Sequence, residues 1–387
     1  MKTVKSEPVP RHQRRQKIRR EIQNLIRVRR LWGRRLMGER ELESTLGVCR
    51  TTVRRVLADL ERENVIERRH GAGTFVSERA RVKGHRRTRR LAIVGLRRYA
   101  ERPGWDFRKE MVMGLLDQSK RSVSELTFFS LDSPEERDRL GSPAEVRRFD
   151  GFISVGVDDP EILARLVELD RGPVVLLDGY VRGLPVTTVV DNGFDAMRTT
   201  ARHLLALGHR RIAFIDCHNR AVNNPEKFAG YRAALAEKGI VPDEELVAVP
   251  DEPDDLYAVD AGDWNAPSVR GFVSRSVERF LGLADPPTAI LGFDDRRAYP
   301  ALQELEGRGL RVGTNYSVAG CGDQAVRRGV TDRLTSARIY PRQMGQEALR
   351  AATASGTSRE ARTIFVPTRL MIRSSTCQPS GRIERQK

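Results

Sequence analysis

The stretch Leu46 to Glu61, LGVCRTTVRRVLADLE, combines side chains that can bind a polyanion with a spacing that can bury one side of a helix. Its polar side chains crowd into the first two turns, at Arg50, Thr51, Thr52, Arg54 and Arg55. Arginine forks bind guanine edges and phosphates, and threonine binds phosphates or thymine methyl groups. Its apolar side chains recur every three or four residues, at Val53, Val56, Leu57 and Leu60. The pattern is typical of a helix that enters the major groove of DNA.

The neighbouring residues distinguish a recognition helix from an ordinary amphipathic helix with a solvated basic face. Residues 39–46, ERELESTL, predict a short helix, and a three-residue turn containing Gly47 separates it from the next helix, which is helix-turn-helix spacing. Residues 65–76 predict two short strands around a glycine turn, which would form a wing. We therefore expect a winged helix-turn-helix. It should pack on an earlier helix with the apolar stripe Ile18, Ile22, Leu25 and Ile26.

The excess positive charge is confined to the beginning of the chain. The first 90 residues contain 27 basic and 10 acidic residues, and the remaining residues contain 42 of each. Charge concentrated in one domain indicates a polyanionic partner. A membrane surface is the rival partner, but the basic helices have apolar residues at core spacing and no aromatic-rich face for lipid. We therefore expect double-stranded DNA as the partner and no membrane.

The remainder of the chain predicts a parallel α/β sheet, because strand-like apolar runs alternate with helical patterns from Leu91 onward. Strands are expected near residues 91–95, 126–131, 151–155, 173–177 and 211–215, and around Ala289 and Val318. We expect a disordered segment at 1–13, the DNA-binding domain at 14–76, a basic linker at 77–90, an effector and dimerisation domain at 91–376, and a tail at 377–387.

Cysteines and apolar runs narrow the class of protein further. The four cysteines, Cys49, Cys217, Cys321 and Cys377, have no paired spacing, so neither a disulfide framework nor a metal site is expected. No apolar run approaches about 18 residues. We therefore expect a soluble, cytoplasmic protein without a metal or cofactor.

Residues 14–76 resemble the winged helix-turn-helix of the GntR family of bacterial transcription regulators. The run GERELESTLGVCRTTVRRVLADLERENVIERRHGAGTFV carries the resemblance. It departs from the family at Met37-Gly38, where Pro-Ser is usual, and at Cys49, where serine usually caps the recognition helix; Cys49 should weaken the helix start by roughly 0.5 to 2 kcal/mol. The resemblance implies DNA contacts from Arg40, Arg50, Thr51, Thr52 and Arg54, and from His70 and Gly71 at the wing tip.

Residues 91–376 resemble the effector domain of the LacI/GalR family, which is similar to periplasmic sugar-binding proteins. The segments that carry this resemblance include FDGFI, HLLALGHRRIAFI, KFAGYRAAL, GDW, PPTAILGFDD, LTSARIYPRQMG and VPTRLMIRSS. It implies a two-lobed, doubly wound domain, with 91 to about 207 plus about 340 to 354 in the first lobe. The fold class is thus α/β, a winged helix-turn-helix plus a two-lobed periplasmic-binding-protein-like domain. Arabinose-type repressors have this architecture.

The same resemblance implies an effector site between the lobes. Its contacts would come from Trp105, Asp191, Lys227, Trp264, Asp294 and Asp295. Lys227 stands where the family usually has arginine, and Gly322 stands where it usually has aspartate. Lysine offers a mobile point charge in place of a rigid fork, so the pocket would fit a different ligand, such as one with its own negative charge, or would have lost its effector.

These expectations describe a DNA-binding transcription regulator, most simply a repressor, that binds a palindromic operator as a homodimer and is controlled by a carbohydrate-like ligand. The alternative is a ligand-independent DNA-binding protein whose C-terminal domain serves only assembly. An enzyme is not expected, because G-x-S-x-G, GxxxxGK[ST] and H-E-x-x-H are absent. His209 is expected to cap a helix end or to interact with its dipole.

Overall fold

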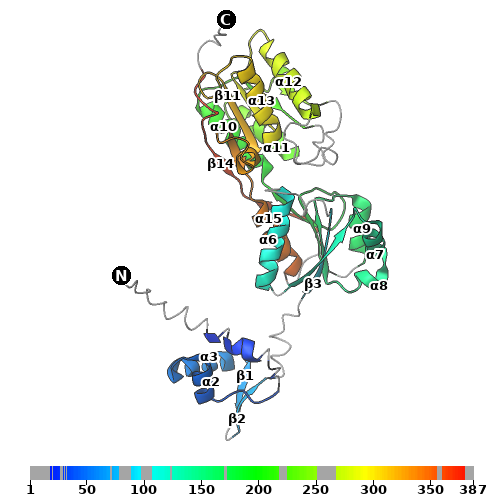
Figure 1. The fold of residues 1–387 in the computed structure, drawn as a ribbon, viewed down its shortest axis with the longest axis vertical. Coiled ribbons are helices and arrows are strands. Elements are labelled where there is room, and N and C mark those ends of the chain that lie inside the picture. Colours follow the sequence, from blue (N-terminus) through cyan, green and yellow to red (C-terminus); the bar gives the residue numbers. More distant parts are fainter. Residues whose placement is uncertain are drawn as a thin grey trace. The chain divides into compact units, whose positions relative to one another are not determined.

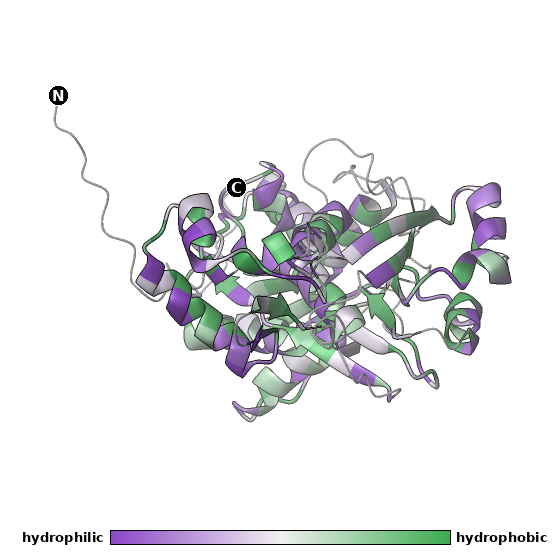
Figure 2. Cartoon of the chain, turned by 90° about the horizontal axis from the view of Figure 1, so that it is seen from below, coloured by the Kyte–Doolittle hydropathy of each residue, from purple (hydrophilic) through white to green (hydrophobic). Residues whose placement is uncertain are grey.

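The computed structural model consists of two compact units, Met1–Thr88 and Arg89–Lys387 (Figure 1). It describes residues 18–19, 21–26, 29, 31, 33–69, 72–77, 89–96, 107–122, 124–169, 172–217, 225–250, 267–354 and 360–379. The segments predicted to be a disordered N-terminus and most of the basic linker lie outside these residues. Helices in Figure 2 carry hydrophobic and hydrophilic residues side by side, as expected of helices with one buried face.

The first unit is a winged helix-turn-helix. Helices α2 (Glu39–Leu46) and α3 (Arg50–Arg62) are joined by a turn in which Gly47 has a φ of 61°, and α3 leads into the antiparallel pair β1 (Ile66–Arg69) and β2 (Gly73–Val76). The buried side of α3 is the predicted one, Val53, Val56, Leu57 and Leu60. These side chains share a core with the predicted stripe, of which Ile18, Ile22 and Ile26 are buried and Leu25 is partly buried.

The first lobe of the second unit is a six-stranded parallel sheet with the order β13-β7-β6-β5-β3-β4. Its strands are β3 (Arg89–Gly95), β4 (Ser124–Ser130), β5 (Gly151–Val155), β6 (Val174–Leu177), β7 (Thr187–Asp191) and β13 (Arg362–Val366). One face is covered by α6 (Phe107–Ser122) and α15 (Pro341–Thr353), and the other by α7 (Pro134–Gly141), α8 (Pro143–Val146) and α9 (Pro160–Glu168). Successive residues of β3 point alternately into the hydrophobic cores on the two faces of this sheet.

The second lobe repeats this plan with the order β14-β12-β11-β10-β8-β9. Its strands are β8 (Ile212–Ile215), β9 (Val247–Ala248), β10 (Ala289–Gly292), β11 (Ser317–Gly322), β12 (Thr335–Arg338) and the antiparallel β14 (Arg369–Met371). Helices α10 (Gly193–Ala206) and α11 (Pro225–Ala236) cover one face. Helices α12 (Pro267–Leu281) and α13 (Asp295–Gly307) cover the other. The short α14 (Gln324–Arg327) follows β11.

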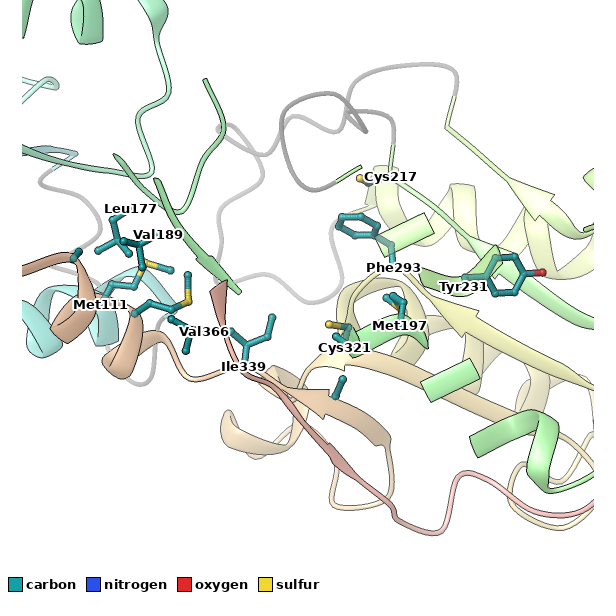
Figure 3. Close-up of a cluster of buried hydrophobic side chains, with 14 of the residues drawn as sticks. Met111, Leu177, Val189, Met197, Cys217, Tyr231, Phe293, Cys321, Ile339 and Val366 are labelled. Carbon is teal, nitrogen blue, oxygen red and sulfur yellow. The ribbon is translucent and has the colours of Figure 1, made fainter. Parts of the chain in front are cut away.

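The chain passes between the two sheets three times: after β7, after β12 and between β13 and β14. In Figure 3, Ile339 and Val366 on the later crossings lie between Leu177 and Val189 of the first lobe and Phe293 and Cys321 of the second. The expected boundary near residue 207 is wrong, because α10 packs on the second sheet and the first crossing is at Asn192. Strand β13 also belongs to the first lobe, beyond the expected limit at residue 354.

Candidate nucleic-acid interface and effector site

The recognition helix α3 begins without the usual cap. The Cys49 side chain makes no capping hydrogen bond to the backbone, as predicted from its poor capping ability. Its Sγ instead lies 3.3 Å from Thr51 Oγ1 and 3.0 Å from Thr52 Oγ1. The backbone N–H of Arg50 donates to Glu43 Oε1 at 3.2 Å, so a carboxylate of α2 satisfies a donor at the start of α3. The sequence pattern did not indicate this substitute cap.

The polar face of α3 is exposed in the way that DNA contact requires. Arg50, Thr51 and Arg54 are exposed, and Thr52 is half-buried. Arg40, on the preceding helix, is also exposed. The other two candidate contacts, His70 and Gly71, lie outside the described residues. The described part of the head thus presents two arginines and a threonine on one helix face.

Glu39 brings the two recognition-helix arginines together. Its Oε2 accepts hydrogen bonds from Arg50 Nε at 3.1 Å and from Arg54 Nε at 3.0 Å, and Arg68 of β1 approaches Oε1 to 4.0 Å. Desolvation is the largest single influence on Glu39 and would raise its pKa, but the hydrogen bonds and charges of Arg50 and Arg54 together outweigh it. The pKa of Glu39 is therefore lowered, and the carboxylate is ionised at neutral pH.

The sheets of the second unit place two switch points of strand order near the crossings. In the first sheet the order reverses between β3 and β5, and in the second between β8 and β10. Open α/β sheets bind ligands outside the carboxyl ends of the strands at such points. Of the candidate effector residues, Asp191 ends β7, and Asp294 and Asp295 follow β10. The candidates Trp105 and Trp264 lie outside the described residues.

Lys227 is the most unusual candidate in this region. It is only 6% exposed, and its Nζ lies 4.4 Å from the ring centroid of Phe293. Among the described residues, its ammonium has no hydrogen-bond or ion-pair partner. Burial alone would lower the pKa of Lys227. The nearby Cys321, Asp191 and Asp294 outweigh burial and raise the pKa above its ordinary value, so the group stays protonated. A buried cation that lacks a hydrogen-bond acceptor in the described part of the chain favours a ligand that supplies acceptor oxygens.

Asp294 is already engaged by two arginines. Its Oδ2 accepts from Arg296 at 2.9 Å, and its Oδ1 accepts from Arg297 at 3.0 Å. Arg297 is buried and also donates to Asp216 O. A ligand hydroxyl at Asp294 would therefore share a carboxylate whose position is fixed by this network.

Asp295 serves the fold of the second lobe. It is 1% exposed, its Oδ1 accepts from Ser336 Oγ at 2.6 Å, and its Oδ2 accepts from Ala325 N at 3.1 Å. Burial raises the pKa of Asp295 to about 7. Both oxygens thus hold α14 and β12, so the proposed effector contacts do not include Asp295.

Several charged residues near the crossings were not predicted from the sequence as site residues. Asp178 follows β6 with a φ of 65°, and Arg108 Nε lies 3.4 Å from its Oδ2. Burial raises the pKa of Asp178, and the charge of Arg108 offsets this only in part. Burial and then the charge of Asp191 likewise raise the pKa of Glu226. The only sequence signal was the position of Asp178 directly after a buried strand.

His209 caps the end of α10, as expected, because its backbone N–H donates to Leu204 O at 3.2 Å just after the left-handed Gly208. Its side chain, in addition, ties the C-terminal segment to the second lobe. Helix α10 has ended at Ala206, and the imidazole is fully buried. Its Nδ1 lies 2.7 Å from Thr288 Oγ1, and its Nε2 lies 2.9 Å from Cys377 O. Both ring nitrogens are therefore used in holding strands and chain end together.

The described residues contain no group of three or more His, Cys, Asp or Glu side chains arranged to hold a metal ion. No helix among them is long and apolar enough to cross a membrane.

Family comparisons match both units. Residues 14–76 match the bacterial regulatory proteins of the gntR family. Residues 110–260 match the periplasmic binding proteins and sugar binding domain of the LacI family, and residues 201–376 match the periplasmic binding protein-like domain. These matches cover the head and most of the two-lobed unit.

Individual relatives extend over nearly the whole chain. The transcriptional regulator DegA of Bacillus subtilis is 24% identical over 348 residues, which are 87% of this chain and 97% of DegA. The regulator CelR of Thermobifida fusca is 26% identical, covering 85% of this chain and 95% of CelR. A solved structure of a CelR–cellobiose complex aligns with a TM-score of 0.59 and 21% identity, covering 88% of this chain and 100% of that one.

Proposed function

This chain is a DNA-binding transcription regulator, with a GntR-type winged helix-turn-helix joined to a LacI-type effector domain, and we propose that it is a repressor controlled by a small polar ligand. Its relatives of similar length are regulators and not enzymes. The exposed arginines and threonine of α3 carry the proposal, because they form a polar face on a helix whose other face is buried. The proposed contacts to the operator are completed by Arg40, Thr52, His70 and Gly71. We propose that the protein acts in the cytoplasm.

We propose that the ligand is a carbohydrate or a sugar acid bound between the lobes. A related regulator has been solved with cellobiose. Lys227 and Asp294 would bind the oxygens of the ligand, Asp191 would accept from its hydroxyls, and Trp105 and Trp264 would stack on its apolar face. The ligand would stabilise one arrangement of the lobes and so shift the population that binds operator. The buried, charged ammonium of Lys227, which has no hydrogen-bond or ion-pair partner among the described residues, supports this proposal over the ligand-independent alternative.

A thermal-shift screen of the full chain against neutral sugars and sugar acids should identify the effector. A ligand at about 100 times its dissociation constant should add about 2.7 kcal/mol to the free energy of unfolding. Lys227→Met removes the ammonium while keeping a long side chain, and it should abolish the shift. The matched control is Lys238→Met, because Lys238 is exposed just after α11 and should leave the shift intact. If no sugar or sugar acid stabilises the wild-type chain, the ligand-independent alternative is preferred.

We also propose that the protein is a homodimer paired through its first lobe. Met113 and Leu116 of α6 are 36% and 41% exposed, and Phe128 of the edge strand β4 is 39% exposed. Phe128 lies two residues from Leu126, which packs with the α6 cluster, so both elements expose apolar side chains on the same face of the sheet. Exposed apolar side chains that cluster support an interface. Two heads would then read a palindromic operator.

A charged residue introduced into this apolar surface should separate the two subunits of the dimer. Leu116→Glu should convert a dimer into a monomer in sedimentation equilibrium and weaken operator binding at least about ten-fold, because a single head buries too small an interface. Val241→Glu is the control, since Val241 is 83% exposed outside this surface. A wild-type chain that sediments as a monomer on its operator would refute the dimer.

A further inference from the structure

We propose that Glu39 is a positioning residue that sets how sharply the head discriminates between DNA sequences. Resting on the proposed function, the inference assigns Glu39 an action through Arg50 and Arg54, without direct contact with DNA. The observation is the shared carboxylate between the two guanidinium groups, 3.1 Å from Arg50 Nε and 3.0 Å from Arg54 Nε.

The geometry leaves the terminal guanidinium nitrogens of both arginines available to contact a base. Each guanidinium is bound to Glu39 through Nε, and among the described residues the terminal nitrogens of Arg50 and Arg54 have no hydrogen-bond partner. A guanine edge is read by two adjacent N–H groups of one fork. Binding at Nε thus fixes the direction of each fork without occupying its two ends.

The carboxylate also offsets a repulsion that would otherwise spread the two side chains. Arg50 and Arg54 are four residues apart on one helix, where like charges repel. Their side chains are 43% and 59% exposed, whereas that of Glu39 is 21% exposed. Packing therefore restrains Glu39 more than the arginines. Without its charge, each arginine would sample more rotamers, and ordering a fork on a base edge would cost more entropy.

The Glu39 carboxylate should have the opposite effect on the affinity of the head for random DNA. Non-specific binding depends on phosphate neutralisation and needs no fixed fork. A carboxylate beside the DNA face repels phosphates and keeps two cations from moving toward them. Glu39 should therefore strengthen binding to the selected site and weaken binding to any other sequence, and both effects raise the ratio of the two affinities.

The test compares two isosteric changes that alter charge equally in the full-length chain. Glu39→Gln removes the carboxylate shared by Arg50 and Arg54. Glu61→Gln is the matched control, because Glu61 pairs with Arg68, 3.4 Å away, and makes no contact with the recognition arginines. Affinities are measured by fluorescence anisotropy on a duplex selected from random DNA by the wild-type chain and on a permuted duplex, at several salt concentrations.

We expect Glu39→Gln to lower the ratio of specific to non-specific affinity at least about ten-fold, because one bidentate base contact discriminates by about that much. The salt dependence on the permuted duplex should steepen, since freed arginines can reach phosphates. Glu61→Gln should keep the ratio within about two-fold. In an Arg54→Ala background, Glu39→Gln should have a smaller effect, since the two residues act together.

Equal ratios in the two glutamine variants would overturn the inference, because charge alone would then account for the change. Glu39→Asp covers the case in which Glu39→Gln fails to fold: it keeps the charge at the start of α2 but withdraws the oxygens from both Nε atoms. Glu39→Asp should lower the affinity for the selected duplex and leave the affinity for the permuted duplex unchanged. An unchanged ratio of these two affinities would also overturn the inference. A wild-type chain that selects no sequence would instead refute the proposed function.

Discussion

Alanine in place of Gly345 should destabilise the first lobe by about 3 kcal/mol, because no room exists for a methyl group where α15 crosses α6. A Cβ at Gly345 would lie 2.9 Å from the carbonyl carbon of Met111, 3.0 Å from Leu115 N, and closer still to the Met111 carbonyl oxygen. These are backbone atoms, which cannot rotate away. Gly114 makes the reciprocal contact with the backbone of Arg342. The two helices would have to separate, exposing the core that they share.

Thermal unfolding of the full chain measures this loss as a fall of several degrees in the transition of the two-lobed unit. Gly307→Ala is the control, because Gly307 ends α13 and a Cβ there would meet nothing within 4 Å. That variant should be neutral or slightly stabilising. A Gly345→Ala protein that unfolds like the Gly307→Ala protein would show that the helix crossing tolerates separation.

Arg54→Ala should weaken binding to the selected operator by about 1 to 3 kcal/mol and weaken binding to random DNA by less, if its fork reads a base. Arg54 is exposed on α3 and held at Nε by Glu39, so the side chain is available and oriented. Equilibrium titration on the two duplexes gives both losses. An equal loss on both would make Arg54 a phosphate contact.

The neighbouring Arg55→Ala is the control for charge. Arg55 is exposed on the same helix, but Glu39 does not bind it. Removing it should weaken both duplexes similarly, because the lost attraction to phosphates does not depend on sequence. Should Arg55→Ala reduce specific binding more than Arg54→Ala, the assignment of the reading residue would be wrong.

The head was predictable from sequence because its signals are local. The spacing of Val53, Val56, Leu57 and Leu60 gave the buried side of α3, and the glycine turn gave the hairpin. The weak cap at Cys49 followed from residue type alone. The compensation by Glu43 and the clamp by Glu39 did not, because both carboxylates come from another helix and meet α3 only in the folded domain.

The two-lobed unit shows where local patterns stop being informative. Strand β5 was predicted with its observed bounds, but β7 and β13 were missed. Helix α10 looks the same whether it packs on the first or the second sheet, so the crossing at Asn192 left no mark in the sequence. For the same reason, the sequence did not reveal that Arg108 lies beside Asp178, or that Glu226 lies near Asp191.

Equilibrium binding of the full-length chain to its selected duplex and to a permuted duplex tests whether the protein is a sequence-specific DNA-binding regulator. We expect a preference of at least about a thousand-fold for the selected duplex at physiological salt, which is typical of specific regulators. We also expect the selected sequence to contain two half-sites related by two-fold symmetry. Equal affinity for the two duplexes would refute sequence-specific regulation, because binding would then depend on the basic charge of the head alone.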